Sequence, residues 1–317
     1  MRTIARMTLV LGLVVVVVLV LHEGAQSIVS LLKQAGWVLL LLVPLHVPPL
    51  LLDVMGWRVL ILGRVRVLKL FLIASIREAI NRLLPVANIG GEIVGIHLLT
   101  REGISGTTAA SSVVVETVLT LVTQYLFLIL GVACLLSVTD NIHTIGGFLI
   151  VIAGGLPLVL FLIASLRSGT FFRVLKKLAP RILGSTDDDS GILGKMAQVD
   201  TAIRQLIAAH GKLVRAIAWQ LAGLISGCGE TWLALRWLGH PVSLEAALAL
   251  ESLTLAARSL MFVAPAGLGV QEAGLIGIGH VLGMTSDVAI ALSLAKRMRE
   301  IVFGLPALAA WQWAIRI

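Results

Sequence analysis

Long apolar runs recur along the whole chain, and they constrain its fold more than any other feature. A helix needs about 20 mostly apolar residues to cross a bilayer, and six runs qualify: 3–21, 37–57, 107–138, 145–166, 216–237 and 287–313. Apolar residues make up 58% of the 317 residues and charged residues only 13%, against about 25% charged in a typical soluble domain. This pattern excludes a soluble enzyme, a disordered chain and a disulfide-stapled secreted domain. It predicts an all-α polytopic integral membrane protein.

The N-terminal run has the features of either a signal peptide or a first membrane helix. Arg2 and Arg6 precede the apolar run 7–21, but His22, Glu23 and Gly24 follow it in place of an A-x-A-like cleavage site. We therefore expect an uncleaved membrane helix.

The basic residues predict the topology. The formal net charge is +8, and Lys and Arg of membrane proteins gather in cytoplasmic loops. The N-terminus, 58–69 and 167–215 are basic, so we place them in the cytoplasm, with 167–215 as a soluble insert. The chain must then leave and return on one side between Lys69 and Arg101. Hence 70–99 is predicted as a re-entrant helical hairpin from the cytoplasm, and 251–283 as a second hairpin from the outside.

A weak internal repeat supports this topology. A shift of 180 residues superposes Trp57 on Trp237, Pro85 on Pro265, Glu92 on Glu272 and Gly103 on Gly283. Only six positions are identical between 81–124 and 261–304, so a chance match of loop prolines in an apolar chain is the alternative. Inverted repeats with broken helices at matching places indicate a transporter's binding site. We predict one domain over 1–317, an inverted-topology repeat of about 1–140 and about 145–317.

Charged residues inside the apolar runs are the candidate functional residues. A charge at the bilayer centre costs at least ~2.5–3.5 kcal/mol, so it is paired or lines a cavity. The free N–H groups of a helix starting at Gly90 suit an anion. We expect the two hairpin tips to meet near mid-membrane on the path of a lipid head group. The predicted head-group residues are Arg77, Glu78, Asn81, Arg82, Gly90, Gly91, Glu92, Glu116, Arg258, Gly267, Gly269, Gln271, Glu272, Lys296 and Arg297.

Structural roles compete with this hypothesis. Glu92 and Glu272 would then only cap helix starts and pair with basic neighbours. Lys296, Arg297, Arg299 and Glu300 either line a polar cavity or show that the last crossing starts later. Glu116 occupies the position equivalent to Lys296, which predicts an ion pair between them. Further intramembrane carboxylates stand at Asp53, Glu230 and Glu251.

Two stretches resemble a known family. Asn81-Arg82-Leu83-Leu84-Pro85 with Gly90-Gly91-Glu92, and Pro265-Ala266-Gly267-Leu268-Gly269-Val270-Gln271-Glu272, are similar to signatures of the lysylphosphatidylglycerol synthase transmembrane, flippase-like superfamily. Leu83-Leu84-Pro85 with Gly90-Gly91-Glu92-Ile93-Val94-Gly95, and Leu294-Ala295-Lys296-Arg297 before Gly304-Leu305-Pro306, are most similar to its hopanoid-biosynthesis-associated HpnL group. The resemblance implies a lipid-handling protein of the bacterial inner (plasma) membrane. Some relatives carry an aminoacyl-transferase domain. We expect none here, and hence no lipid aminoacylation.

Lipid translocation is therefore the leading hypothesis, with membrane lipids and lipid-biosynthesis enzymes as partners. The sequence contains no GxxxxGK[ST] P-loop, so we expect no ATPase activity. It has no CxxC or Cys/His cluster, so we expect no metal and no cofactor, and no basic, aromatic-interleaved helix for nucleic acid. The alternatives are an integral-membrane lipid-modifying enzyme, which would use Asp187-Asp188-Asp189, and a non-catalytic scaffold that docks through 167–215.

Overall fold

The computed structural model describes residues 25–84, 90–139, 142–168, 189–260 and 269–316, and all regular structure in these ranges is helical. The predicted crossing 3–21, the tips 85–89 and 261–268 with Pro85, Pro265 and Gly267, and the acidic residues Asp187 and Asp188 lie outside them. The helices are α2 (Ala25–Ala35), η1 (Gly36–Leu41), α3 (Leu42–Leu45), α4 (Val47–Leu60), α5 (Val67–Leu83), α6 (Gly90–Arg101), α7 (Gly106–Val138), α8 (Ile142–Ser168), α10 (Asp189–Ala208), α11 (His210–Trp237), α12 (Leu244–Leu260), α13 (Val270–Val281) and α14 (Ser286–Arg316).

The predicted crossing at 37–57 is a broken helix. It consists of η1, α3 and α4, and His46 joins the last two. Pro48 and Pro49 stand in the first turn of α4, where a missing backbone N–H removes no intrahelical hydrogen bond. The break therefore places one polar residue, His46, in the middle of an apolar stretch.

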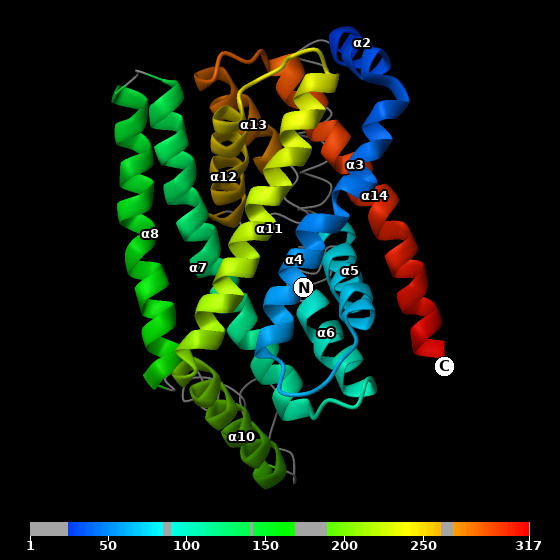
Figure 1. Cartoon of the computed structure of the whole chain (residues 1–317), viewed down its shortest axis with the longest axis vertical. Helices are drawn as coiled ribbons and strands as arrows, with labels where there is room; N and C mark the ends of the chain where they lie inside the picture. Colours follow the sequence, from blue (N-terminus) through cyan, green and yellow to red (C-terminus); the bar gives the residue numbers. More distant parts are fainter. Residues whose placement is uncertain (1–24, 85–89, 140–141, 169–188, 261–268, 317) are drawn as a thin grey trace.

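Two helix pairs and two long helices organise the bundle. In Figure 1, α5 and α6 lie in the lower half and α12 and α13 in the upper half, while α7 and α14 run between the halves in opposite directions. Each long helix packs on the first helix of the other pair, α7 on α12 and α14 on α5. The bounds of α6 and α13, and the first residues of α7 and α14, differ by 180 in number. Gly103 and Gly283, in the turns before the long helices, have φ of 86° and 75°.

Helices α4 and α11 pack closely through glycines. A Cβ on Gly56 would lie 3.0 Å from the carbonyl oxygen of Ala216, and one on Gly223 would lie 3.0 Å from that of Pro49. Small residues let membrane helices approach in this way. The close packing holds α4 beside α11 and so positions the polar residues that both helices carry.

Two stretches of the described residues have both the length and the composition of membrane spans. The stretch Gln26–Leu60 and α7 are long and apolar enough to cross a bilayer, and a shorter apolar helix covers Ile152–Ser165. With 28 and 31 residues, α11 and α14 are also long enough, although they carry several charges. Large apolar side chains face outward, among them Leu68 and Phe161, which are 77% and 64% exposed. Such an apolar exterior suits lipid.

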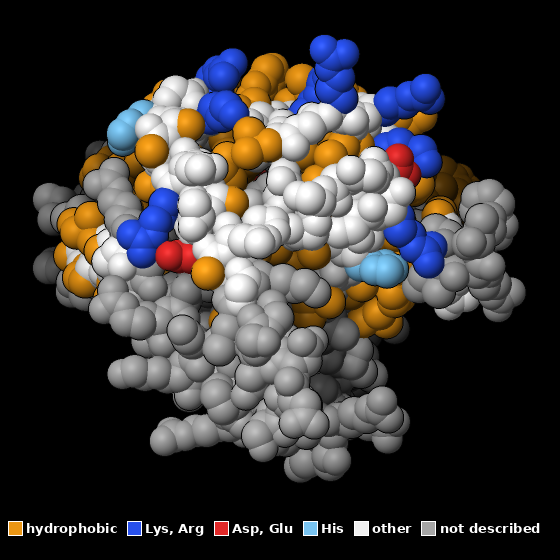
Figure 2. All heavy atoms as spheres, turned by 90° about the horizontal axis from the view of Figure 1, so that it is seen from below, with side chains coloured by type: hydrophobic (Ala, Val, Ile, Leu, Met, Phe, Trp, Pro, Cys, Tyr) orange, Lys and Arg blue, Asp and Glu red, His pale blue; other side chains and the backbone are white. Residues whose placement is uncertain are grey.

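The lower end of the bundle carries much of the basic charge. Figure 2 shows Lys and Arg side chains spread over this face with few Asp or Glu. Helix α10 also lies at this end (Figure 1) and packs on α7, where Ile203 and Leu206 are buried beside Leu119. Part of the insert predicted at 167–215 is thus a packed helix, and α11 begins at His210, earlier than the predicted crossing.

Candidate functional site

A cavity of about 520 Å³ lies between α4, α5, α6, α7, α11, α12 and α14. We call it the central cavity. Its size is that of a small-molecule site, but its walls are unusually polar for a helix bundle in lipid. The charged and titratable lining residues are His46, Asp53, Arg77, Glu78, Arg82, Glu92, Glu116, Glu230, Glu251, Arg258, Lys296 and Arg299. Ionisable residues inside a membrane are costly and by default indicate a functional site.

Arg77 is the charged centre of the lower helix pair. Its Nη2 donates to a carboxylate oxygen of Glu92 and, at 2.7 Å, to Oε2 of Glu116. Its guanidinium also lies over the ring of Trp57, 4.4 Å from the centroid. One side chain therefore joins α5 to α6, α7 and α4. Such a cation between two carboxylates offsets their burial in a low dielectric.

The side chain of Asn81, which belongs to α5, lies against the start of α6. Its Oδ1 accepts from the backbone N–H of Gly91 at 2.9 Å, and its Nδ2 donates to Oε1 of Glu92 at 3.4 Å. A Cβ on Gly91 would lie 2.5 Å from the carbonyl oxygen of Arg77 and 2.7 Å from Oδ1 of Asn81. The sequence predicted that this helix start binds an anion. The structure gives the N–H of Gly91 to Asn81 instead, because the glycine lets α5 approach.

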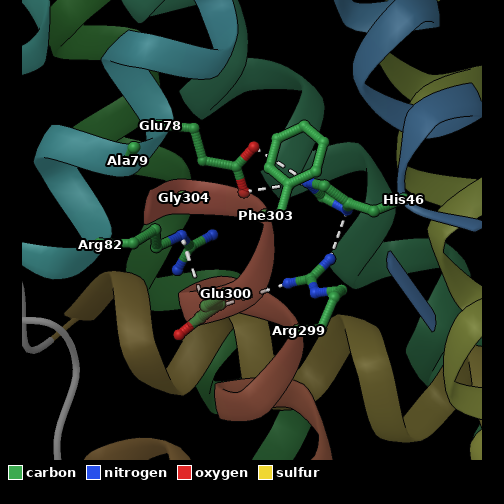
Figure 3. A pocket seen from close by; sticks show the side chains of 8 residues that line it. All are labelled: His46, Glu78, Ala79, Arg82, Arg299, Glu300, Phe303 and Gly304. Carbon is green, nitrogen blue, oxygen red and sulfur yellow. Dashed lines mark hydrogen bonds and ion pairs between the residues drawn. The ribbon is translucent and has the colours of Figure 1, made fainter. Parts of the chain in front are cut away.

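His46 is the centre of a second charged group (Figure 3). Its Nε2 lies 2.9 and 3.1 Å from the two carboxylate oxygens of Glu78, and its Nδ1 lies 3.0 Å from Oε1 of Glu230. Nη1 of Arg299 contacts the same Nδ1 and donates to Oε2 of Glu230 at 2.8 Å. The edge of the ring faces Phe303, with centroids 5.1 Å apart. Residues of α5, α11 and α14 thus converge on the break between α3 and α4.

Glu300 lies among four arginines. Its carboxylate is 3.7 to 3.9 Å from guanidinium nitrogens of Arg82, Arg258, Arg297 and Arg299. At these distances the contacts are ion pairs without close hydrogen bonds. Arg82 and Arg258 also line the central cavity, so two of the four arginines that pair with Glu300 are cavity residues.

The upper helix pair holds its glutamate differently. Oε2 of Glu272 accepts from the backbone N–H of Gly269 at 2.8 Å, and Oε1 accepts from Ser293 Oγ at 2.8 Å and Arg297 Nε at 3.2 Å. The residue is 1% exposed. It caps α13 and pairs with a basic neighbour, as the structural alternative predicted. Gln271 is buried beside it and accepts from Arg258 at 3.0 Å.

The predicted ion pair between Glu116 and Lys296 is wrong. Glu116 pairs with Arg77, and Lys296 pairs with Glu251, which also accepts from Thr231 at 2.5 Å. Each counter-ion lies on the first hairpin helix of the same half of the chain, Arg77 on α5 and Glu251 on α12. Residues at equivalent positions of two copies need not face each other.

The structure brings together eight of the fifteen predicted residues on the cavity wall: Arg77, Glu78, Asn81, Arg82, Glu92, Glu116, Arg258 and Lys296. Gly90 and Gly91 form the first turn of α6. Gly269, Gln271, Glu272 and Arg297 are not among the lining residues, so their contact with a head group stays a prediction, and Gly267 lies outside the described residues. These four form the packed start of α13 and its anchor on α14.

Five charged or titratable cavity residues were not among the predicted ones: His46, Asp53, Glu230, Glu251 and Arg299. Four of them are charges inside apolar runs and could have been included on that ground. His46 also had a signal, since it is a polar residue between Pro44 and Pro48 in an apolar run. Asp53 makes no hydrogen bond or ion pair with the described part of the chain.

Comparison with known protein families identifies the chain. The model of the lysylphosphatidylglycerol synthase TM region matches residues 5–307. The chain belongs to this family. It is therefore a membrane protein involved in lipid biology. Comparisons with curated proteins and with solved structures gave no match. In the described ranges no three His, Cys, Asp or Glu residues are grouped so that they could hold a metal ion.

Proposed function

We propose that this protein moves lipids between the leaflets of the bacterial inner membrane by passing the polar head group through the central cavity. The observation that carries the proposal is the cavity itself, about 520 Å³ lined by acidic and basic side chains within a bundle of apolar exterior. A polar head group in hydrocarbon loses its hydrogen bonds, at a cost of several kcal/mol for each unpaired group. Charged walls of both signs replace those bonds while the acyl chains stay in lipid.

The arrangement of the helices supports an inverted repeat with two re-entrant hairpins. The α5/α6 and α12/α13 pairs lie in opposite halves of the bundle (Figure 1), and the 180-residue offset relates α6 to α13 and α7 to α14. Inverted repeats with interrupted helices place binding sites near the membrane midplane. We propose that residues 1–317 form one such domain, opened alternately from its two ends.

The basic lower end supports the proposed orientation. Arg58, Arg204, Lys212 and Arg215 belong to the ends of helices there, and α10 lies on the same side (Figures 1 and 2). Positively charged ends of membrane helices face the cytoplasm. We propose that this end, together with the N-terminus, is cytoplasmic and that α10 is where lipid-biosynthesis enzymes dock.

Arg82 and Arg258 are the proposed head-group ligands. Their side chains are 28% and 17% exposed, and both line the cavity beside Glu300. Guanidinium groups bind phosphate in bidentate fashion, which favours a lipid with a phosphate-bearing head. The motif similarity to the HpnL group makes a hopanoid the competing substrate. We propose that the protein neither hydrolyses ATP nor modifies the lipid.

Lipid scrambling in proteoliposomes tests the proposal. Fluorescent phospholipids and native lipids, including hopanoids, are added, and wild type is compared with Arg82→Gln/Arg258→Gln. We expect the double variant to move its lipid at least about tenfold more slowly, which corresponds to about 1.4 kcal/mol in the barrier.

The matched control is Arg58→Gln/Lys69→Gln, which removes two exposed basic side chains from outside the cavity. It should move lipid at the wild-type rate. If wild type moves none of these lipids, or if the cavity variant equals the control, the translocation proposal fails.

A further inference from the structure

The Nδ1 atom of His46 faces one hydrogen-bond acceptor and one donor. Oε1 of Glu230 lies 3.0 Å away and can only accept, whereas Nη1 of Arg299 contacts the same nitrogen and can only donate. Nε2 faces both oxygens of Glu78, so it carries a hydrogen in either protonation state. Glu78 therefore fixes the ring through Nε2, while Nδ1 can bond either Glu230 or Arg299.

Each protonation state of His46 uses a different partner. In the neutral ring Nδ1 has a lone pair and accepts from Arg299, which bonds Glu230 at the same time. In the protonated ring Nδ1–H donates to Glu230, and Arg299 then meets a donor of its own charge. The guanidinium must therefore turn away from the ring. Binding of one proton thus replaces Arg299 by Glu230 as the hydrogen-bond partner of Nδ1.

The charges around His46 favour the binding of that proton. The charged groups in contact with His46 are Glu78 on α5, Glu230 on α11 and Arg299 on α14, while Glu300 on α14 lies beyond them among Arg82, Arg258 and Arg297. Two carboxylates thus contact the ring beside one guanidinium group, and a protonated imidazole makes this contact set neutral. An unbalanced buried charge is strongly unfavourable, so the set stabilises an added proton more than a balanced one would.

The ring can also exchange its proton. His46, Glu78, Arg82 and Arg299 line both the central cavity and a small space of about 10 Å³ on its edge (Figure 3). That space has room for about one water molecule. Water in the cavity can thus carry a proton to or from Nδ1 without opening the helix packing.

From this geometry we infer that His46 is a proton-binding site that couples a proton to head-group movement through Arg299. The inference rests on the proposed function. Water delivers a proton to Nδ1, Nδ1–H bonds Glu230, and the displaced guanidinium of Arg299 faces the cavity as an added ligand for an anionic head group. Loss of the proton draws Arg299 back to the ring and releases the head group. The proton gradient across the membrane then drives lipid in one direction.

Lipid movement under an imposed pH gradient tests the coupling. Proteoliposomes carry a fluorescent anionic phospholipid and enclose pyranine, which reports internal pH. For wild type we expect the gradient to change the rate of lipid movement at least about fivefold, with proton flux that depends on the lipid. For His46→Gln the ratio of the rates with and without the gradient should be close to one. For His97→Gln, which removes an exposed imidazole on α6, the ratio should stay at the wild-type value.

A measurement without transport separates the two proposals. Nitrogen NMR of labelled histidine in nanodiscs, with His46 assigned by comparison with His46→Gln, should show the ring change from neutral to doubly protonated within the pH range where the protein stays folded. A ring that keeps one protonation state, or a wild-type rate that ignores the gradient, overturns the coupling even if lipid moves. Failure of wild type to move lipid while His46 titrates refutes the proposed function and leaves the proton site standing.

Discussion

The helix pairs α5/α6 and α12/α13 have the same arrangement of helices and turns, but their charged residues differ. The α6 and α13 helices have the same length and a 180-residue offset, and each precedes a long helix after a turn with a left-handed glycine. At that offset Glu92 matches Glu272, yet Glu116 matches Lys296 and Glu78 matches Arg258, with opposite charges. The lower pair centres on a cation, Arg77, and the upper pair on a buried anion, Glu272.

The difference teaches that helix placement and charge pairing are separate constraints. The helix ends follow from local signals such as the glycine turns, which both copies keep. The counter-ions of Glu116 and Lys296 lie within their own copies, on Arg77 of α5 and on Glu251 of α12. Each copy can therefore balance a charge on its long helix with a charge on its own hairpin helix, and the two copies are free to differ in sign.

The largest effect should come from removing the cation of the lower pair. Arg77→Gln leaves Glu92 and Glu116 without their shared counter-ion inside the bundle. We expect the free energy of unfolding to fall by about 3–5 kcal/mol, as for other buried pairs that lose one partner. SDS-induced unfolding in mixed micelles measures it. Lys69→Gln, which breaks a surface pair with Glu102, should cost about 0–1 kcal/mol. Equal losses for the two variants would show that Arg77 is not a buried centre.

An intermediate effect should come from closing the space between α5 and α6. Gly91→Ala places a methyl group 2.5 Å from the carbonyl oxygen of Arg77, so the helices must separate. Overpacking of this kind costs about 1–3 kcal/mol. Gly277→Ala in α13 is the matched control in the upper pair, because no atom lies within 4 Å of the added carbon. It should be neutral or slightly stabilising, since alanine favours a helix. The same unfolding assay applies. An unchanged free energy of unfolding for Gly91→Ala would contradict the close contact between α5 and α6.

The smallest effect should come from the hydroxyl group that distinguishes the upper pair. Ser293 donates to Glu272 at 2.8 Å, and the equivalent position of the lower pair is Val113. Ser293→Ala should cost about 1 kcal/mol through loss of that bond. Ser112→Ala is the control, because the buried Ser112 hydroxyl, among the described residues, bonds only the carbonyl oxygen of Ala109 in its own helix. A cost no greater than that of the control would mean that Arg297 and the helix start suffice to hold Glu272.

Much of the fold was predictable because its signals are local. The expected helix start at Gly90 agrees with the first residue of α6. The sequence left two explanations for the charges around Lys296, and the structure shows that Lys296 and Arg299 line the central cavity from the middle of α14. The pairing of Glu116 with Lys296 failed because equivalence between copies says nothing about which helices touch.

The sequence by itself determined that the chain is a bundle of membrane helices, where several of the long helices begin and end, and that charges lie inside them. Apolar runs, glycines and prolines act over a few residues, so these features need no knowledge of distant contacts. Only the tertiary structure decided which of the charges meet. His46, Glu230 and Arg299 lie far apart in the sequence and become neighbours where a broken helix packs between α5, α11 and α14. Charge pairing inside a membrane depends on that packing, because a buried charge is stabilised by whichever opposite charge the helices bring within reach.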